Sequence, residues 1–162
     1  MTIKPEENAS EGGSFHPLSF SPETYVFEQL FVLGYAESQP ISVYTNGNID
    51  ISVVVRTLTP VEIRDVLEIC GQLGSQGAQS IVERIETLAR GIVTINHAPL
   101  VLTKKEQQDF YEKYNRSPSP LDMARIILNE KIKSLDVIDL IYEAYVKFTN
   151  SVTKDFEKAK KK

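Results

Sequence analysis

Few side chains in this sequence are suited to acid–base, nucleophilic or metal chemistry. The two histidines, His16 and His97, have no carboxylate or thiol at the spacing of metal ligands. No serine lies in a Gly-x-Ser-x-Gly context, the strained turn that carries the nucleophile of many hydrolases. The Asn-His-Ala-Pro stretch around His97 is instead typical of an exposed turn. We therefore expect no catalytic residue, no metal site and no cofactor.

Three glycines spaced three residues apart, Gly71, Gly74 and Gly77, are a candidate phosphate-binding loop. Such loops follow a strand and open a helix, so that backbone N–H groups and the helix dipole converge on the anion. This run follows a predicted helix instead, and no Lys-Ser or Lys-Thr pair comes after it. Termination of one helix and a link to the next is the simpler explanation. We expect no nucleotide site here.

Length, composition and charge are those of a soluble globular protein. The 162 residues are 41% hydrophobic and 25% charged, enough for one domain with a hydrophobic core. A net charge of −4 disfavours a nucleic-acid backbone as the main partner. Cys70 is the only cysteine, which excludes an internal disulfide. The first residues lack the pattern of a secretory signal, and no apolar run approaches about 20 residues, so we expect a cytoplasmic protein without a membrane partner.

The segment 48–100 carries the clearest structural pattern. Alternating apolar residues predict a strand over 48–56. A Thr-Pro-Val-Glu sequence at 59–62 predicts a helix that begins with a capping box. A second helix extends to Gly91, and the β-branched run 92–95 predicts a short return strand. The segment therefore predicts a small α+β core.

The residues before this core predict a hairpin. Strand 41–44 precedes Asn46-Gly47, the strongest short-range signal for a tight turn, so it is expected to pair antiparallel with strand 48–56. Ser21-Pro22-Glu23 could cap a short helix that extends to about residue 33. The alternative is a strand over 25–33, because β-branched and aromatic residues are dense there. Gly34 ends the element in both cases.

The C-terminal part predicts helices only. A second capping box at Thr103 opens one helix, and the Ser-Pro-Ser-Pro run 117–120 ends it and caps a helix from Leu121 to about Ile132. The last helix begins at Ser134 or Asp136 and carries a broad apolar stripe. We predict an α+β fold, mostly α, in which a small antiparallel β-hairpin or sheet accompanies a bundle of four to five helices.

The same patterns predict three parts of the chain. Residues 1–22 form a flexible or partner-ordered N-terminal arm, residues 23–152 a single α+β domain, and residues 153–162 a basic C-terminal tip. Six apolar or aromatic residues in the arm and on the last helix are candidates for partner binding: Phe15, Leu18, Phe20, Tyr142, Tyr145 and Phe148. For the three residues of the arm, the alternative is that they lie in a loosely packed tail. For the three residues of the last helix, the alternative is that they face the core.

Two capped helices joined by a glycine-containing turn also suggest a helix-turn-helix. A recognition helix needs free basic residues to meet phosphate groups. The second helix balances Arg84 and Arg90 against Glu83 and Glu86, so core packing explains it better.

Three stretches of the chain resemble tail assembly chaperones and related baseplate-hub proteins of tailed bacteriophages. They are 51–62 (ISVVVRTLTPVE), 86–100 (ETLARGIVTINHAPL) and 137–145 (VIDLIYEAY). In those proteins a strand ends in an Arg-Thr-Leu-Thr-like corner that leads into a helix with an early Glu. The N-terminal arm and the run 117–120 depart from the pattern, so the resemblance implies no role for them.

The resemblance implies a non-enzymatic assembly protein that binds the tape-measure protein or other tail proteins, such as tube or baseplate subunits. It acts in the host cytoplasm during assembly, and a hub relative would remain in the virion tail. Association into a homo-oligomer is a further expectation, and nucleic acid is not an expected partner. The alternative is a cytoplasmic adaptor or a DNA-binding regulator with a helix-turn-helix-like core.

Overall fold

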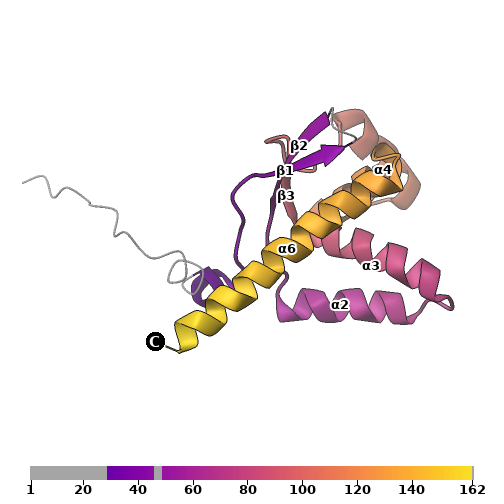
Figure 1. Cartoon of the computed structure of the whole chain (residues 1–162). Coiled ribbons are helices and arrows are strands. Elements are labelled where there is room, and N and C mark those ends of the chain that lie inside the picture. The colour runs from indigo at the N-terminus through magenta and orange to yellow at the C-terminus, as the bar shows by residue number, and fades with distance from the viewer. Residues whose placement is uncertain (1–28, 46–48, 162) are drawn as a thin grey trace, which may run out of the picture.

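The computed structural model describes residues 29–45 and 49–161 (Figure 1). Its elements follow the order of the prediction. They are β1 (Ile41–Thr45), β2 (Ile49–Val55), α2 (Pro60–Gly71), α3 (Gln76–Gly91), β3 (Ile92–Ile95), α4 (Lys104–Tyr114), α5 (Pro120–Ile126), the π-helix η1 (Ile127–Lys131) and α6 (Leu135–Lys160). The predicted α+β fold, mostly α with a small antiparallel sheet, is confirmed.

The sheet has the strand order β1-β2-β3, and both pairs are antiparallel. Val43 of β1 lies opposite Ile51 of β2, which is the pairing expected of the predicted hairpin. The turn residues 46–48 of that hairpin lie outside the described residues. The register between β2 and β3 shifts after Val54, so Val93 is an extra residue on β3 at a β-bulge.

Side-chain caps explain where three helices begin. The hydroxyl groups of Thr59 and Thr103 each accept a hydrogen bond from the backbone N–H of the glutamate three residues on. The carboxylate of that glutamate in turn accepts the backbone N–H of the threonine. Both predicted capping boxes are therefore confirmed. Ser119 and Asp122 form a third box at the start of α5, within the predicted Ser-Pro-Ser-Pro boundary.

The core lies where the helices cover the sheet. In Figure 1, α2 and α3 form a helical hairpin, and α6 crosses in front of α3 and the sheet. The helix α6 contacts α3, β1 and β2. The largest fully buried side chains come from both strands and helices of this assembly: Val53, Val55, Leu88, Leu128 and Ile141. Their burial supplies the main stabilising term of the fold.

The structure corrects the predicted role of the three glycines. Gly71 is the last residue of α2, and Gly77 lies in the first turn of α3, because Ser75 rather than a glycine caps that helix. Only Gly74 lies in the link between the two helices. The helix α3 therefore begins one residue before Gly77, and the N-cap hydrogen bond of Ser75 outweighs the low helix propensity of glycine.

The helix predicted from Leu121 to Ile132 is not a uniform α-helix. It changes to a π-helix after Ile126, and the Ile132 N–H donates to the Ile127 carbonyl five residues back. The side-chain amide of Asn129 donates to the Arg125 carbonyl at 2.8 Å, in competition with the backbone N–H. This local competition is not visible in the apolar periodicity.

The two ends of the described chain are helical. Residues 29–33 form a helix, which favours the helical alternative for this part of 23–33, and Gly34 ends it with a φ of 76°. At the other end, residues 153–160 continue α6 without a break. The arm 1–22 lies outside the described residues.

Candidate functional site

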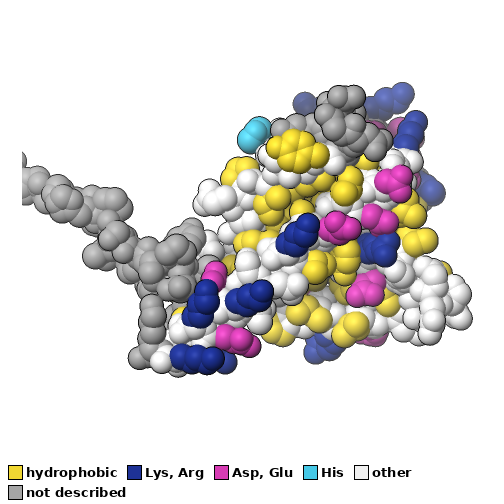
Figure 2. Space-filling view, in the orientation of Figure 1, with side chains coloured by type: hydrophobic (Ala, Val, Ile, Leu, Met, Phe, Trp, Pro, Cys, Tyr) yellow, Lys and Arg dark blue, Asp and Glu magenta, His cyan; other side chains and the backbone are white. Residues whose placement is uncertain are grey.

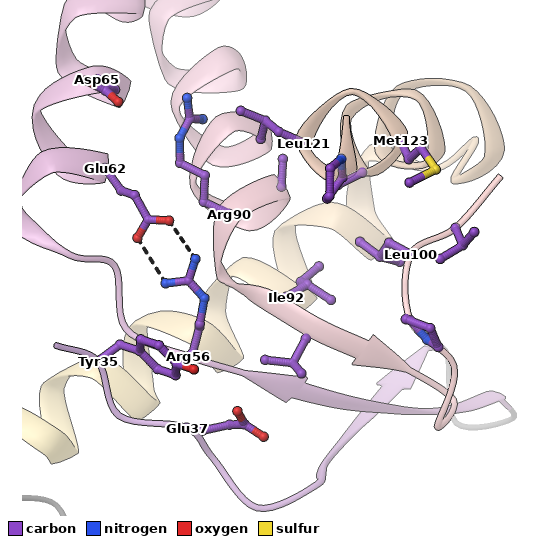
Figure 3. A pocket seen from close by; sticks show the side chains of 16 residues that line it. Tyr35, Glu37, Arg56, Glu62, Asp65, Arg90, Ile92, Leu100, Leu121 and Met123 are labelled. Atoms are coloured by element: carbon purple, nitrogen blue, oxygen red, sulfur yellow. Dashed lines mark hydrogen bonds and ion pairs between the residues drawn. The ribbon is translucent and has the colours of Figure 1, made fainter. Parts of the chain in front are cut away.

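A groove between the sheet, α2, α3 and α5 is lined by both apolar and charged side chains. We call it the central groove, and its volume is about 630 Å³, the size of a small-ligand or peptide-side-chain pocket. Figure 3 shows the side chains that line it, which come from every one of these elements. The loop after β3 closes one side through Pro99, Leu100 and Val101.

Arg56 and Glu62 form a two-point ion pair at one end of the central groove. The guanidinium nitrogens Nη1 and Nη2 donate to the Glu62 carboxylate oxygens at 2.9 and 2.6 Å (Figure 3). The same carboxylate accepts the backbone N–H of Thr59 at 2.9 Å. Glu62 therefore belongs both to the capping box of α2 and to the lining of the central groove. The Arg56 guanidinium also lies over the Tyr35 ring, 5.0 Å from its centroid.

The pKa shifts of this pair keep both groups ionised near neutral pH. The hydrogen bond from Arg56 lowers the pKa of Glu62 to about 2, and bonds from Thr59 act in the same direction. The hydrogen bond to Glu62 in turn raises the pKa of Arg56. Both groups therefore stay charged and engaged with each other at pH 7.

A second ion network lies in the wall behind the groove. Glu86 of α3 is only 7% exposed, and it binds Arg90 of the same helix and Arg125 of α5. Arg125 donates to both carboxylate oxygens, at 2.8 and 2.7 Å. Burial raises the pKa of Glu86, but the hydrogen bonds from Arg125 and Arg90 outweigh it and leave the pKa below its ordinary value. Glu86 therefore stays ionised and joins α3 to α5.

The remaining wall of the central groove is mostly apolar. The half-buried side chains of Leu100, Leu121 and Met123 contribute to it, and Val101 is 53% exposed. Two acidic residues, Glu37 and Asp65, also line the groove, and no ion pair within the described residues involves either of them. The groove is suited to bind an apolar side chain or segment with a cationic group beside it.

A second groove lies between β1 and α6, and we call it the β1–α6 groove. Its volume is about 670 Å³, and it is lined by the segment 38–44 and by one side of α6. Figure 2 shows hydrophobic and charged side chains side by side on the face where α6 passes the sheet. Tyr44, 66% exposed, lies at this groove.

The structure places the candidate partner-binding residues of α6 in different environments. Tyr145 is 8% exposed and lies in the core, where an ideal Cβ at Gly91 would be 2.9 Å from its ring. Tyr142 is half-buried, and its ring centroid is 6.1 Å from that of Tyr145. Phe148 lines the β1–α6 groove. Phe15, Leu18 and Phe20 lie outside the described residues.

Sequence reasoning did not identify the charged residues of the central groove as a site. Glu62 was recognised only as a cap, and Glu86 and Arg90 only as part of a charge balance. Arg56 follows β2 directly and lies six residues before Glu62, in the Arg-Thr-Leu-Thr corner that leads into α2. That corner was the available signal, but the partner of Arg56 became clear only from the geometry.

The helix-turn-helix-like block does not present free arginines on its second helix. Arg84 donates to Asp139 of α6 at 2.6 Å, and Arg90 is paired with Glu86. Both cations of α3 that could meet phosphate groups are therefore neutralised within the chain. This observation supports the core-packing interpretation of α3.

The remaining candidate residues lie apart from both grooves. His97 is an exposed turn residue, and both Asn96 and His97 have positive φ, as a tight two-residue turn requires. Cys70 is buried, and burial raises the pKa of its thiol. Within the described residues, no three His, Cys, Asp or Glu side chains form a group that could hold a metal ion. None of the described helices is both long and apolar enough to cross a membrane.

Comparison with protein-family models, with curated proteins and with solved structures finds no match to this chain.

Proposed function

We propose that this chain is a non-enzymatic assembly protein that binds an apolar segment of another protein in the central groove. The observation that carries the proposal is that the arginines at the central groove are paired with glutamates beside an apolar wall. Arg56 neutralises Glu62, and Arg90 and Arg125 neutralise Glu86. These residues therefore supply a rigid frame, while the apolar wall supplies the binding surface.

The proposed partner class is the tail proteins of a tailed bacteriophage. The resemblance of three stretches of the chain to tail assembly chaperones and baseplate-hub proteins supports this class. The tape-measure protein is the first candidate, and tube or baseplate subunits are the next. A net charge of −4 keeps the chain soluble while it holds an apolar partner.

The charges along the groove suggest which segment fits. Glu37 and Asp65 line the groove without an ion-pair partner among the described residues, so a lysine or arginine beside the apolar anchor of the partner is favoured. The anchor itself would pack against Leu121, Met123 and Val101. A segment with both features would gain hydrophobic burial and electrostatic complementarity together.

Co-expression with the tape-measure protein of the same genome tests this proposal. The two proteins are expected to co-purify, and Val101→Glu is expected to abolish co-purification because it places a charge on the apolar wall. Val61→Glu is the matched control, since Val61 is 55% exposed on α2 and lines none of the grooves described above. Absence of co-purification, or equal loss in both variants, contradicts the proposal.

Mass spectrometry of purified virions separates the two forms of the proposal. A chaperone that departs after assembly is absent from the particle, whereas a baseplate-hub component is present in a fixed ratio to other tail proteins. Absence from virions together with no association in the co-expression experiment would overturn both forms.

A further inference from the structure

The outer edge of β1 is open within the described part of the chain. On β2, both backbone groups of Ser52 point toward β3. Its N–H donates to the side-chain oxygen of Asn96 at 3.0 Å, and its carbonyl accepts the Asn96 backbone N–H at 2.7 Å. Successive residues of an antiparallel strand direct these groups to opposite neighbours, so Ile51 and Val53 bond β1. The register pairs them with Val43 and Ile41.

Ser42 and Tyr44 therefore direct their backbone N–H and C=O groups away from β2, at the edge of the sheet. No described backbone or side-chain group bonds them there. Pro40 precedes β1 and lacks an N–H, so it limits the open edge to the five residues of the strand. An open edge of this kind is a site for addition of another strand.

The adjoining side of α6 has a pattern suited to a symmetric contact. The apolar side chains of Leu140, Ala144 and Phe148 follow one another at a spacing of four residues and line the β1–α6 groove. Glu143 and Lys147 line the same groove, and both are exposed. No ion pair within the described chain involves either residue.

We propose that a second copy of this chain docks on the β1–α6 groove, so that β1 pairs antiparallel with β1 of the second copy. A two-fold axis beside Val43 places Ser42 opposite Tyr44 of the second copy, and the outward backbone groups of both residues then bond each other. The pairing uses all five residues of β1 and joins two three-stranded sheets into one. It is the self-complementary interface that two-fold symmetry requires.

Charge complementarity favours a second copy over other occupants. A two-fold axis perpendicular to the joined sheet keeps both copies of α6 on the same face and makes them antiparallel. Val43 lines the same groove as Glu143 and Lys147. An axis beside Val43 therefore places Glu143 opposite Lys147 of the second copy, and the two-fold symmetry repeats the contact, which gives two equivalent ion pairs. The apolar residues at 140, 144 and 148 pack between them.

Sedimentation velocity and light scattering of the full chain test this proposal. We expect a particle of twice the 18.2 kDa chain mass that dissociates on dilution. Lys147→Glu and Glu143→Lys should each weaken the dimer at least tenfold, because each places like charges opposite one another. The double variant Glu143→Lys with Lys147→Glu should restore the dimer. Lys154→Glu, an exposed α6 residue outside the groove, is the control and should leave it unchanged.

Ser42→Pro tests the strand pairing separately. It removes an N–H that points away from β2, so the hairpin should persist, which a thermal melt checks, while the dimer weakens. A full chain that is monomeric at all concentrations overturns the proposal, as does a double charge variant that fails to restore the dimer. A monomer that binds the tape-measure protein, and loses it in Ser42→Pro, would place a foreign strand on this edge and also overturn the proposal.

This inference is independent of the proposed function, since Val101→Glu alters the central groove and should leave the dimer intact.

Discussion

Arg125 and Glu86 are 39 residues apart in the sequence, yet two guanidinium nitrogens of Arg125 donate to the two carboxylate oxygens of Glu86 at 2.8 and 2.7 Å. Glu86 is almost entirely buried, and Arg90 binds the same carboxylate. This pair joins α3 to α5 beside the central groove. The shape of the groove therefore depends on a buried charge whose partners come from two helices.

Removal of Arg125 should destabilise the fold. In Arg125→Met the methionine keeps the apolar contacts of the stem, but Glu86 retains only one of its two cations. Since removal of one partner of a buried pair leaves an incompletely compensated charge, we expect a loss of about 3 kcal/mol in the free energy of unfolding by urea. Arg84→Met is the control, because its pair with Asp139 is partly exposed and should cost less than about 1 kcal/mol. Equal losses in the two variants would contradict the structural role of Glu86.

Gly91 is required by close packing and not by backbone conformation. An ideal Cβ at this position would lie 2.9 Å from Cε2 of Tyr145 and 3.3 Å from Cδ1 of Leu58. Gly91→Ala should therefore destabilise the protein by about 1–3 kcal/mol, as overpacking of a core does. Gly77→Ala in the first turn of the same helix meets no atom within 4 Å and should be neutral or stabilising. Thermal unfolding of both variants measures the contrast, and a neutral Gly91→Ala would mean that Tyr145 can move aside.

Glu62 should make stability depend on pH in the acidic range. Its pKa is about 2 in the folded chain, chiefly because of the hydrogen bond from Arg56, against an ordinary value of 4.5. The unfolded chain binds this proton first as pH falls, so the contribution of Glu62 is present above about pH 5 and is lost as pH approaches 2. Urea unfolding at pH 6, 4 and 3 should show the stability difference between wild type and Glu62→Gln shrinking as pH falls.

The control for that pH series is Glu68→Gln, an exposed residue of the same helix that forms no ion pair within the described residues. A Glu68→Gln difference that shrinks as steeply as that of Glu62→Gln would show that the pH dependence does not come from the pair with Arg56. A Glu62→Gln difference that is independent of pH would mean that the ion pair with Arg56 does not persist in solution.

The capping box of α4 should contribute a measurable part of the stability. The Thr103 hydroxyl accepts the Glu106 N–H at 3.3 Å, and the Glu106 carboxylate accepts the Thr103 N–H at 2.8 Å. Thr103→Ala removes the first bond, and we expect a loss of about 1 kcal/mol in chemical denaturation. Thr103→Ser keeps the hydroxyl and should retain most of the stability. A serine variant as unstable as the alanine variant would assign the effect to the lost methyl group.

The elements that the sequence predicted correctly are those that depend on interactions between residues a few positions apart. The boxes at Thr59 and Thr103 need only residues three positions apart, and Asn46-Gly47 between two alternating runs specifies a hairpin without reference to the rest of the chain. The same local reasoning was less accurate where two local forces compete. The Asn129 side chain bonds a backbone carbonyl where α5 changes to the π-helix, and Ser75 caps α3 ahead of Gly77. Apolar periodicity predicts neither feature.

The candidate site was predictable only in its components. Glu62, Glu86 and Arg90 each have a recognisable local role, but Arg56 and Arg125 carry no periodic signal that assigns their partners. The aromatic stripe of α6 was visible in the sequence, whereas its division between the core at Tyr145 and the groove at Phe148 was not. Periodicity identifies one side of a helix, and the neighbouring elements decide what covers it.

By itself, the sequence determined the order of the strands and helices, the positions of the caps and the mostly helical α+β class. Those features depend on backbone hydrogen bonds and apolar spacing within a few residues. The tertiary structure alone decided that Arg125 reaches Glu86, that Arg84 reaches Asp139 and that β1 is an edge strand of the sheet formed by the described residues. The reason is geometric, since contacts between residues 39 or 55 positions apart depend on how helices pack against the sheet.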